Sequence, residues 1–325
     1  MAVIDQALTR SRRARKPETL ADLMTFVGFT SGVANIIMQL ALPPVGHGVH
    51  ESRVASGSPR RRPFKRLRTT GQHLVVSVAG NEQDRAAFRE EMRKVHAHVH
   101  STASSPVKYS GNARDLQLWV AACLYRFYID QYEFLYGPLD RATLDVLTPA
   151  ASPLATGVNV REAEWPQSWQ EFEDYWDSMR PVLSLAPDVR EDMNTLSNFM
   201  FLYEALGAPG WVLAKVFGPF NHFLTRGNLP PEFRDMMGWE WSDADQLRFD
   251  RILRLLRLVD VVNPQALAAY NKVLLLDLRL RLRLGGSILG REKILDAPLG
   301  EQGRTPAERR RNRHQPDGPR PGSGR

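Results

Sequence analysis

Cysteine is almost absent from this 325-residue sequence, since Cys123 is its only thiol. One thiol can form neither an intramolecular disulfide nor a cage of cysteines around a metal. Cys123 lies in the apolar run 119–124, which predicts a small buried core residue rather than a reactive group. The sequence also lacks an apolar run of membrane-spanning length, and no signal-type cleavage site follows its basic first 16 residues. We therefore expect a cytoplasmic protein, with peripheral attachment to a membrane left open.

Several catalytic and nucleotide-binding motifs are also absent. The sequence contains no G-x-x-x-x-G-K-[ST] phosphate loop, no G-x-G-x-x-G dinucleotide fingerprint and no G-x-S-x-G nucleophile elbow. His96 and His100 are four residues apart, but the residues between them lack the glutamate of the H-E-x-x-H zinc motif. Nothing here supports an NTPase, a dinucleotide-dependent enzyme, an α/β-hydrolase or a zinc protease.

The net charge of +7 suggests nucleic acid at first sight, but the charge lies in the two ends of the chain. Residues 1–16 and 301–325 each carry a net charge of +4, which leaves about −1 for the rest. Basic tails of this kind usually stay solvated or bind acidic surfaces weakly. We therefore expect no specific nucleic-acid partner.

The composition predicts one domain between two polar ends. Residues 303–325 are rich in Arg, Pro and Gly and contain too few large apolar residues to offset the entropy of ordering them. The expected organisation is a flexible basic N-terminus over 1–18, a single all-α domain over 19–300 and a disordered tail over 301–325. No internal repeat or interdomain linker is evident between these ends.

Apolar residues between the two ends recur with the helical period, and no alternation typical of strands is sustained. Pro43-Pro44 and Gly137-Pro138 are expected to end two of the helices, while Ser168 and Ser242 are expected to cap two others. These signals predict an all-α fold. The expected helices cover residues 26–42, 66–78, 83–100, 115–136, 168–179, 189–206, 211–224, 242–261 and 264–284.

His96 is the strongest candidate ligand among eight histidines. It adjoins the apolar stripe of Met92, Val95 and Val99, so its imidazole should face the interior, where one nitrogen donor suits the iron of a buried porphyrin. The alternative is a core histidine bonded to a backbone carbonyl, which spacing alone favours. The basic run 64–70 could place one or two arginines beside a cofactor, or could be a solvated helix start. The aromatic cluster within 165–176 has the spacing of packing residues.

Five segments, taken in order and spacing, resemble the MpaB / latex-clearing (rubber oxygenase) family. Tyr109 to Val120 reads Y-S-G-N-A-R-D-L-Q-L-W-V, which is similar to that family's Tyr-Ser/Ala-x-x-x-x-Asp/Glu-Leu-x-Leu-Trp-Val segment. Residues 66–70 resemble its Arg-x-x-x-Thr element, and residues 93–99 resemble its Arg-x-x-His-x-x-Val helix. Residues 32–43 and 229–242 resemble two further segments. The resemblance covers about residues 20–285.

This resemblance implies an all-helical fold with a globin-like core and haem b as cofactor. It implies that His96 is the proximal iron ligand and that Arg66 and Thr70 lie beside the haem. Rubber-cleaving members have a catalytic acid upstream of the arginine, for which Glu51 is the only nearby candidate here. The implied chemistry is activation of O2 at the iron and insertion across a carbon–carbon double bond of an isoprenoid-like chain.

The sequence departs from the rubber-cleaving members at Thr69, where they have a lysine that can occupy the distal side of the iron. This puts rubber itself in doubt as the substrate, and we expect an open or water-ligated sixth position unless His47 or His50 reaches the iron. The family's glycine shortly after His-x-x-Val is also missing. Helical facing suggests that the substrate channel is lined by Phe26, Phe29, Trp119 and Tyr125.

Two classes of function follow. The first is a haem b-dependent oxygenase that acts with O2 on a hydrophobic small molecule, isoprenoid or lipid. The alternative is a non-catalytic α-helical protein that binds haem or a lipid. The substrate, the redox partner and the oligomeric state stay open at this point.

Overall fold

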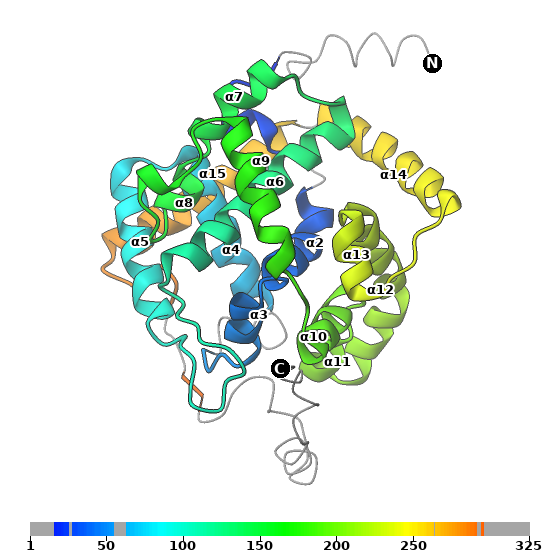
Figure 1. Cartoon of the computed structure of the whole chain (residues 1–325), viewed down its shortest axis with the longest axis horizontal. Coiled ribbons are helices and arrows are strands. Elements are labelled where there is room, and N and C mark those ends of the chain that lie inside the picture. Colours follow the sequence, from blue (N-terminus) through cyan, green and yellow to red (C-terminus); the bar gives the residue numbers. More distant parts are fainter. Residues whose placement is uncertain (1–15, 26–27, 55–62, 263, 291–293, 296–325) are drawn as a thin grey trace, which may run out of the picture.

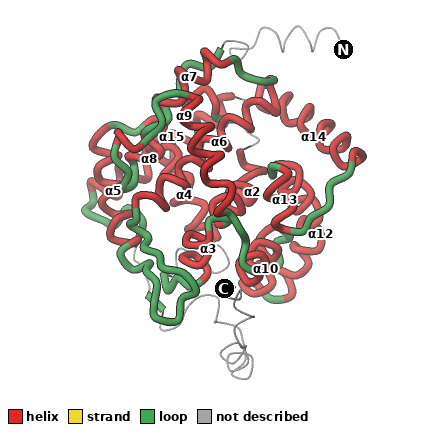
Figure 2. The backbone as a smooth tube through the Cα atoms, viewed as in Figure 1, coloured by secondary structure: helices red, strands yellow, loops and turns green. Residues whose placement is uncertain are grey.

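The structure, a computed structural model, describes residues 16–25, 28–54, 63–262, 264–290 and 294–295. Within these ranges one helix follows another along the chain. Figure 2 shows helices joined by loops, and no strand occurs within these ranges. Extended pairing there is limited to the isolated bridges Val54–Ile294 and His100–Ser110. The expected all-α fold is confirmed. The tail 301–325 and the first 15 residues lie outside the described ranges.

Most of the predicted helices are found near their expected bounds. In chain order the elements are η2 (Leu20–Leu23), α2 (Gly28–Leu40), α3 (Pro43–His50), α4 (Pro63–Ala79), α5 (Glu82–His96), α6 (Arg114–Tyr136), α7 (Arg141–Ala150), α8 (Pro153–Thr156), η4 (Glu162–Glu164), α9 (Trp169–Met179), η5 (Arg180–Val182), α10 (Pro187–Ser197), α11 (Phe201–Leu206), α12 (Ala208–Asn228), α13 (Pro231–Met237), α14 (Asp243–Val262) and α15 (Pro264–Arg283).

Two differences from the expected helices have local causes. Pro43-Pro44 do end α2, but they also begin α3, because proline is tolerated in the first turn of a helix where its missing N–H is not needed. The helix expected over 189–206 is divided into α10 and α11. Phe199 lies at the division with a φ of 60°, a left-handed conformation that no helix continues through.

The centre of the fold is the pair α2 and α6, which the other helices surround (Figure 1). Asn35 of α2 donates to the carbonyl oxygen of Cys123 at 2.7 Å, and the indole of Trp119 in α6 donates to the carbonyl oxygen of Gln39 at 3.1 Å. These bonds satisfy polar groups that burial would otherwise leave unpaired. Cys123 is fully buried in this core, as expected.

The aromatic cluster packs against α6, as its spacing predicts. Phe172 of α9 contacts Tyr125 edge-to-face at 5.0 Å between ring centroids, and Trp176 lies 5.0 Å from Trp119. Ser168 caps α9 by accepting the backbone N–H of Glu171, as expected. The cluster is therefore part of the core rather than of a cofactor site.

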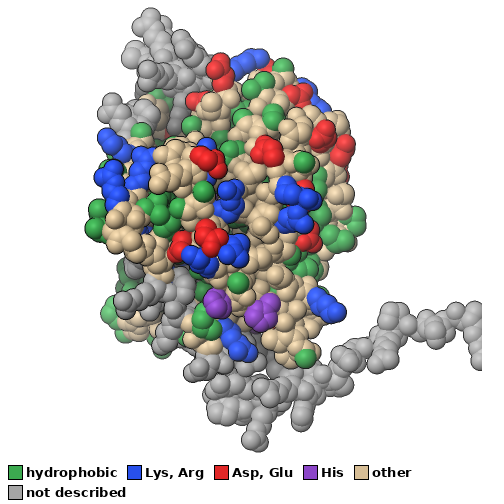
Figure 3. Space-filling view, turned by 90° about the vertical axis from the view of Figure 1, so that its left-hand side faces the viewer, with side chains coloured by type: hydrophobic (Ala, Val, Ile, Leu, Met, Phe, Trp, Pro, Cys, Tyr) green, Lys and Arg blue, Asp and Glu red, His purple; other side chains and the backbone are tan. Residues whose placement is uncertain are grey.

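Two ion pairs hold α15 against α4 and α5. Asp84, which also caps the start of α5, accepts from Arg279 at 2.8 Å, and Arg68 of α4 pairs with Asp277 at 3.0 Å. Arg68 thus faces α15. On the outer face over α5, basic and acidic side chains alternate, as on a solvated surface (Figure 3). None of the described helices is both long enough and apolar enough to cross a membrane.

The contact between α12 and α14 requires a glycine at position 227. A Cβ atom there would lie 2.4 Å from the buried ring of Phe249, whereas a Cβ at the exposed Gly32 of α2 would meet nothing within 4 Å. We expect Gly227→Ala to lower the free energy of unfolding by about 1–3 kcal/mol. Gly32→Ala, the control, should raise it by up to about 1 kcal/mol. Urea unfolding measures both changes. Equal free energies of unfolding for the two variants would contradict the close contact between Gly227 and Phe249.

Candidate functional site

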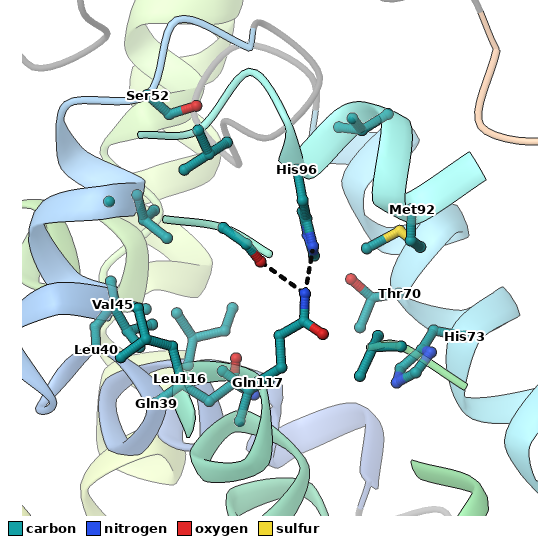
Figure 4. A pocket seen from close by; sticks show the side chains of 18 of the residues that line it. Gln39, Leu40, Val45, Ser52, Thr70, His73, Met92, His96, Leu116 and Gln117 are labelled. Carbon is teal, nitrogen blue, oxygen red and sulfur yellow. Dashed lines mark hydrogen bonds between the residues drawn. The ribbon is translucent and has the colours of Figure 1, made fainter. Parts of the chain in front are cut away.

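A cavity of about 250 Å³ lies among α2, α3, α4, α5 and α6. Figure 4 shows side chains from these helices converging on it. Most of its lining is apolar, which suits a hydrophobic ligand. The apolar side chains are Ile36, Leu40, Pro44, Val45, Val49, Val54, Met92, Val95, Val99, Leu116, Val120, Ala121, Leu124, Leu154, Val158, Met193 and Leu289.

One face of α4 supplies four polar side chains to the cavity. Arg66, Thr69, Thr70 and His73 all line the cavity, because residues spaced by three, four and seven share one side of a helix. The hydroxyl of Thr69 donates to the carbonyl oxygen of Arg66 at 3.1 Å, so it is bonded to its own helix. The structure thus brings the predicted Arg66 and Thr70 together at the cavity. It adds His73, which the sequence analysis missed although it continues the same spacing.

His96 is the last residue of α5 and lines the same cavity. Its ring points towards Gln117 of α6 (Figure 4). A second cavity of about 350 Å³ also borders His96 and Gln117, together with polar residues such as Arg89 and Asn112. His96 therefore stands in the wall between an apolar and a more polar cavity, facing the interior as predicted.

Gln117 determines which ring nitrogen of a neutral His96 carries the proton. The amide oxygen of Gln117 accepts from the backbone N–H of Asn159 at 2.6 Å, and its nitrogen donates to the carbonyl oxygen of Gly111 at 2.7 Å, so the amide has one allowed orientation. Its nitrogen also lies 3.2 Å from Nδ1 of His96 and can only donate there. The proton of a neutral His96 is consequently on Nε2.

Arg66 is the charged side chain among the described residues that line the cavity. No carboxylate of the described residues forms an ion pair with Arg66, and burial lowers the pKa of its guanidinium. Burial, followed by the charge of Arg66, lowers the pKa of His73 from 6.5 to about 4. Burial and then Arg66 and His73 likewise lower the pKa of His96 to about 4. Both histidines are neutral at pH 7, and Nδ1 of His73 is buried without a hydrogen bond.

Glu51 lies beside the cavity but does not line it. Its carboxylate accepts from the hydroxyl of Tyr109 at 2.7 Å and from Ser105, and the ring of Tyr109 separates it from the cavity by lining the wall. Burial and the Glu51 contact raise the pKa of the Tyr109 phenol. Glu51 is therefore joined to the cavity lining by its hydrogen bond with Tyr109.

The histidines proposed as alternative iron ligands are also outside the lining. His47 has its Nδ1 buried 3.7 Å from Glu51, and His50 is held by Asp188 at 3.2 Å and Asp192 at 2.6 Å. His100 is exposed, in the bridge with Ser110.

The expected channel lining is wrong for two aromatic residues. Trp119 and Tyr125 belong to the aromatic core instead, and the hydroxyl of Tyr125 bonds to Thr148. The cavity face of α6 begins at Leu116 and Gln117 and continues with Val120, Ala121 and Leu124. Because residues 116–125 of α6 are almost all apolar, periodicity could not tell which stripe faces a ligand. Phe26 and the side chain of Phe29 lie outside the described residues.

Comparison with known proteins matches residues 22–258 to the family model described as ER-bound oxygenase mpaB/B'/Rubber oxygenase, catalytic domain. An uncharacterized protein of Mycobacterium bovis and one of Mycobacterium tuberculosis are each 47% identical to this chain over 257 residues. That alignment covers 79% of this chain and 98% of each relative. No solved structure matches, and the globin-like core stays a prediction.

The neutral histidines predict a loss of stability in mild acid. The unfolded chain takes up protons at His73 and His96 near pH 6.5, but the folded protein does so only near pH 4, so stability falls as the pH drops through this window. A His73→Gln/His96→Gln double variant should lose less stability than the parent between pH 6.5 and 4.5. Urea unfolding at the two pH values measures this, with the exposed His98→Gln as control. An unchanged pH dependence in the double variant would contradict it.

Proposed function

The chain belongs to the family of mpaB-type and rubber oxygenase catalytic domains, and we propose that it is a haem b-dependent oxygenase. Its substrates would be O2 and a hydrophobic molecule of isoprenoid or lipid type. The observation that supports this best is the meeting of His96 with the unpaired Arg66 in one apolar cavity. The alternative is a non-catalytic protein that binds haem or a lipid and does not turn over a substrate.

The residues of the cavity fit such a cofactor. A haem needs apolar walls for its faces, one or two protein nitrogens for its iron and a cation for its carboxylates. The lining offers aliphatic side chains, two neutral imidazoles and a guanidinium without a carboxylate partner. Arg66 would pair with a propionate, which would supply the missing negative charge. The described residues hold no cluster of three or more metal-ligating side chains.

His96 would bind the iron through Nε2, with a change at Gln117. In the orientation that Gly111 and Asn159 impose on Gln117, Nδ1 of His96 accepts and Nε2 carries the proton. Coordination through Nε2 requires this proton to move to Nδ1, which then donates instead of accepting. The amide of Gln117 therefore has to leave its present contact, and Gln117 would control how readily His96 becomes a ligand.

A bound haem would supply oxygen activation, and the surrounding side chains would direct it. The hydroxyl of Thr70 can donate to a polar ligand in the cavity, while Thr69 is turned to its own backbone. His73, neutral and with its Nδ1 unbonded among the described residues, can accept a hydrogen bond from such a ligand. A catalytic role for Glu51 would need proton transfer through the Tyr109 hydroxyl. The aliphatic walls exclude water and favour an apolar chain as substrate.

The first test removes the proposed ligand. We expect His96→Ala to lose most of its haem per chain and its Soret band, because the iron would lose its proposed protein ligand and the porphyrin would be held only by packing and by Arg66. The exposed His98→Ala, two residues away, is the matched control and should bind haem normally. The measurement is haem content by pyridine haemochrome assay after reconstitution. Full retention in His96→Ala with an unchanged spectrum would refute the assignment.

The second test concerns the sixth position of the iron. Since His47 and His50 do not line the cavity and Thr69 replaces lysine, we expect an open or water-ligated position. The anaerobically reduced protein should then be high-spin and should bind carbon monoxide at once. A low-spin form that resists carbon monoxide would contradict this. If His73→Ala abolished that form and His50→Ala did not, His73 would be the internal ligand.

A further inference from the structure

Helices α11 and α12 expose an unusual apolar surface on the outside of the molecule. We define this α11–α12 surface by eight side chains that are between 40% and 62% exposed. Isolated exposed apolar residues are normal, but a contiguous group of this size on one helical hairpin marks an interaction site. Its members are Tyr203, Leu206, Trp211, Val212, Leu213, Val216, Phe217 and Phe220.

The exposure follows from how α12 packs. Gly210, Ala214 and Gly218, spaced by four, are the buried residues of its first half. A Cβ at Gly210 would lie 1.9 Å from the carbonyl oxygen of Leu202, and one at Gly218 would lie 2.2 Å from that of Asn198. The smallest residues of α12 therefore form its contact with the preceding segment, residues 198–202. Its large apolar residues point outwards, which reverses the usual amphipathic arrangement and matches small-residue packing in membranes.

We propose that the α11–α12 surface docks the protein peripherally on a phospholipid bilayer. Charge favours this occupant, because the sequence has no acidic residue from 205 to 231 and has Lys215 among the exposed apolar side chains. The ammonium of Lys215 lies 5.7 Å from the ring centre of Trp211, an aromatic–cation pair of the kind found at lipid headgroups. Glu204 adjoins the surface in the sequence, directly after Tyr203.

A second copy of the chain suits this surface less well. A symmetric dimer would bury two copies of Lys215 in one interface, and the stretch 205–231 has no carboxylate to pair with them. A bilayer offers both an apolar interior for the aromatic side chains and negative headgroups for the ammonium. The proposal is independent of whether the cavity binds haem.

Vesicle co-sedimentation with the full-length protein tests the proposal. The parent should bind phosphatidylcholine vesicles weakly, and binding should strengthen when phosphatidylglycerol is included. A Phe217→Ser/Phe220→Ser variant should bind about tenfold or more weakly, since two half-exposed rings no longer enter the lipid. The matched control is Leu247→Ser/Leu255→Ser on α14, whose side chains are 60% and 64% exposed, and it should bind like the parent.

Two results would overturn the proposal. The first is equal vesicle binding by the parent and the Phe217/Phe220 variant, with both folded by circular dichroism. The second is a dimer of the parent in sedimentation velocity that the same substitutions dissociate, without vesicle binding by the parent, which would assign the surface to a second copy. Quenching of tryptophan fluorescence by brominated lipid in the parent, reduced in a Trp211→Phe variant, would support direct insertion at this helix.

Discussion

The rest of the site depends on the guanidinium of Arg66, which lies inside the protein without a carboxylate partner among the described residues. Arg66 cannot lose its proton, so its burial is costly unless a negative group joins it. Its field acts on the two imidazoles of the cavity and helps to keep them neutral. Neutral imidazoles are the form that can bind a metal or accept a proton. One unpaired cation thus prepares the cavity both for an anionic group and for nitrogen ligation.

The helical framework supplies this arrangement from three directions. The face of α4 presents the cation and hydroxyl groups, the end of α5 presents His96, and α6 presents Gln117 among aliphatic residues. These parts stay in register because α2 and α6 are locked by Asn35 and Trp119, and because α15 holds α4 and α5 through Asp277 and Asp84. The site therefore depends on packing far from the cavity.

The sequence predicted the elements far better than the direction of individual side chains. Amphipathic helices such as α5 have a single apolar stripe, and the interior position of His96 followed from it. On α6 apolar residues surround the helix, so nothing local distinguished the cavity stripe of Leu116 and Val120 from the core stripe of Trp119. His73 was missed although its spacing from Thr70 was visible. The role of Gln117 was hidden, because its partners Gly111 and Asn159 are backbone groups that only the fold brings near.

Helix α12, on the outside of the molecule, is a second case in which the sequence predicted the helix but not the direction of its side chains. Its apolar residues were sufficient to predict a helix, but not which side would be buried, because the deciding contacts involve the backbone of residues 198 and 202. Because Gly210 and Gly218 lie on the inner side of α12, the aromatic residues on its other side are exposed. The other side of α12 packs on α2, and α2 in turn contributes Ile36 and Leu40 to the cavity wall. The exposed apolar surface and the cavity are thus connected through the packing of α12 on α2, so a change in how α12 packs would reach one wall of the cavity.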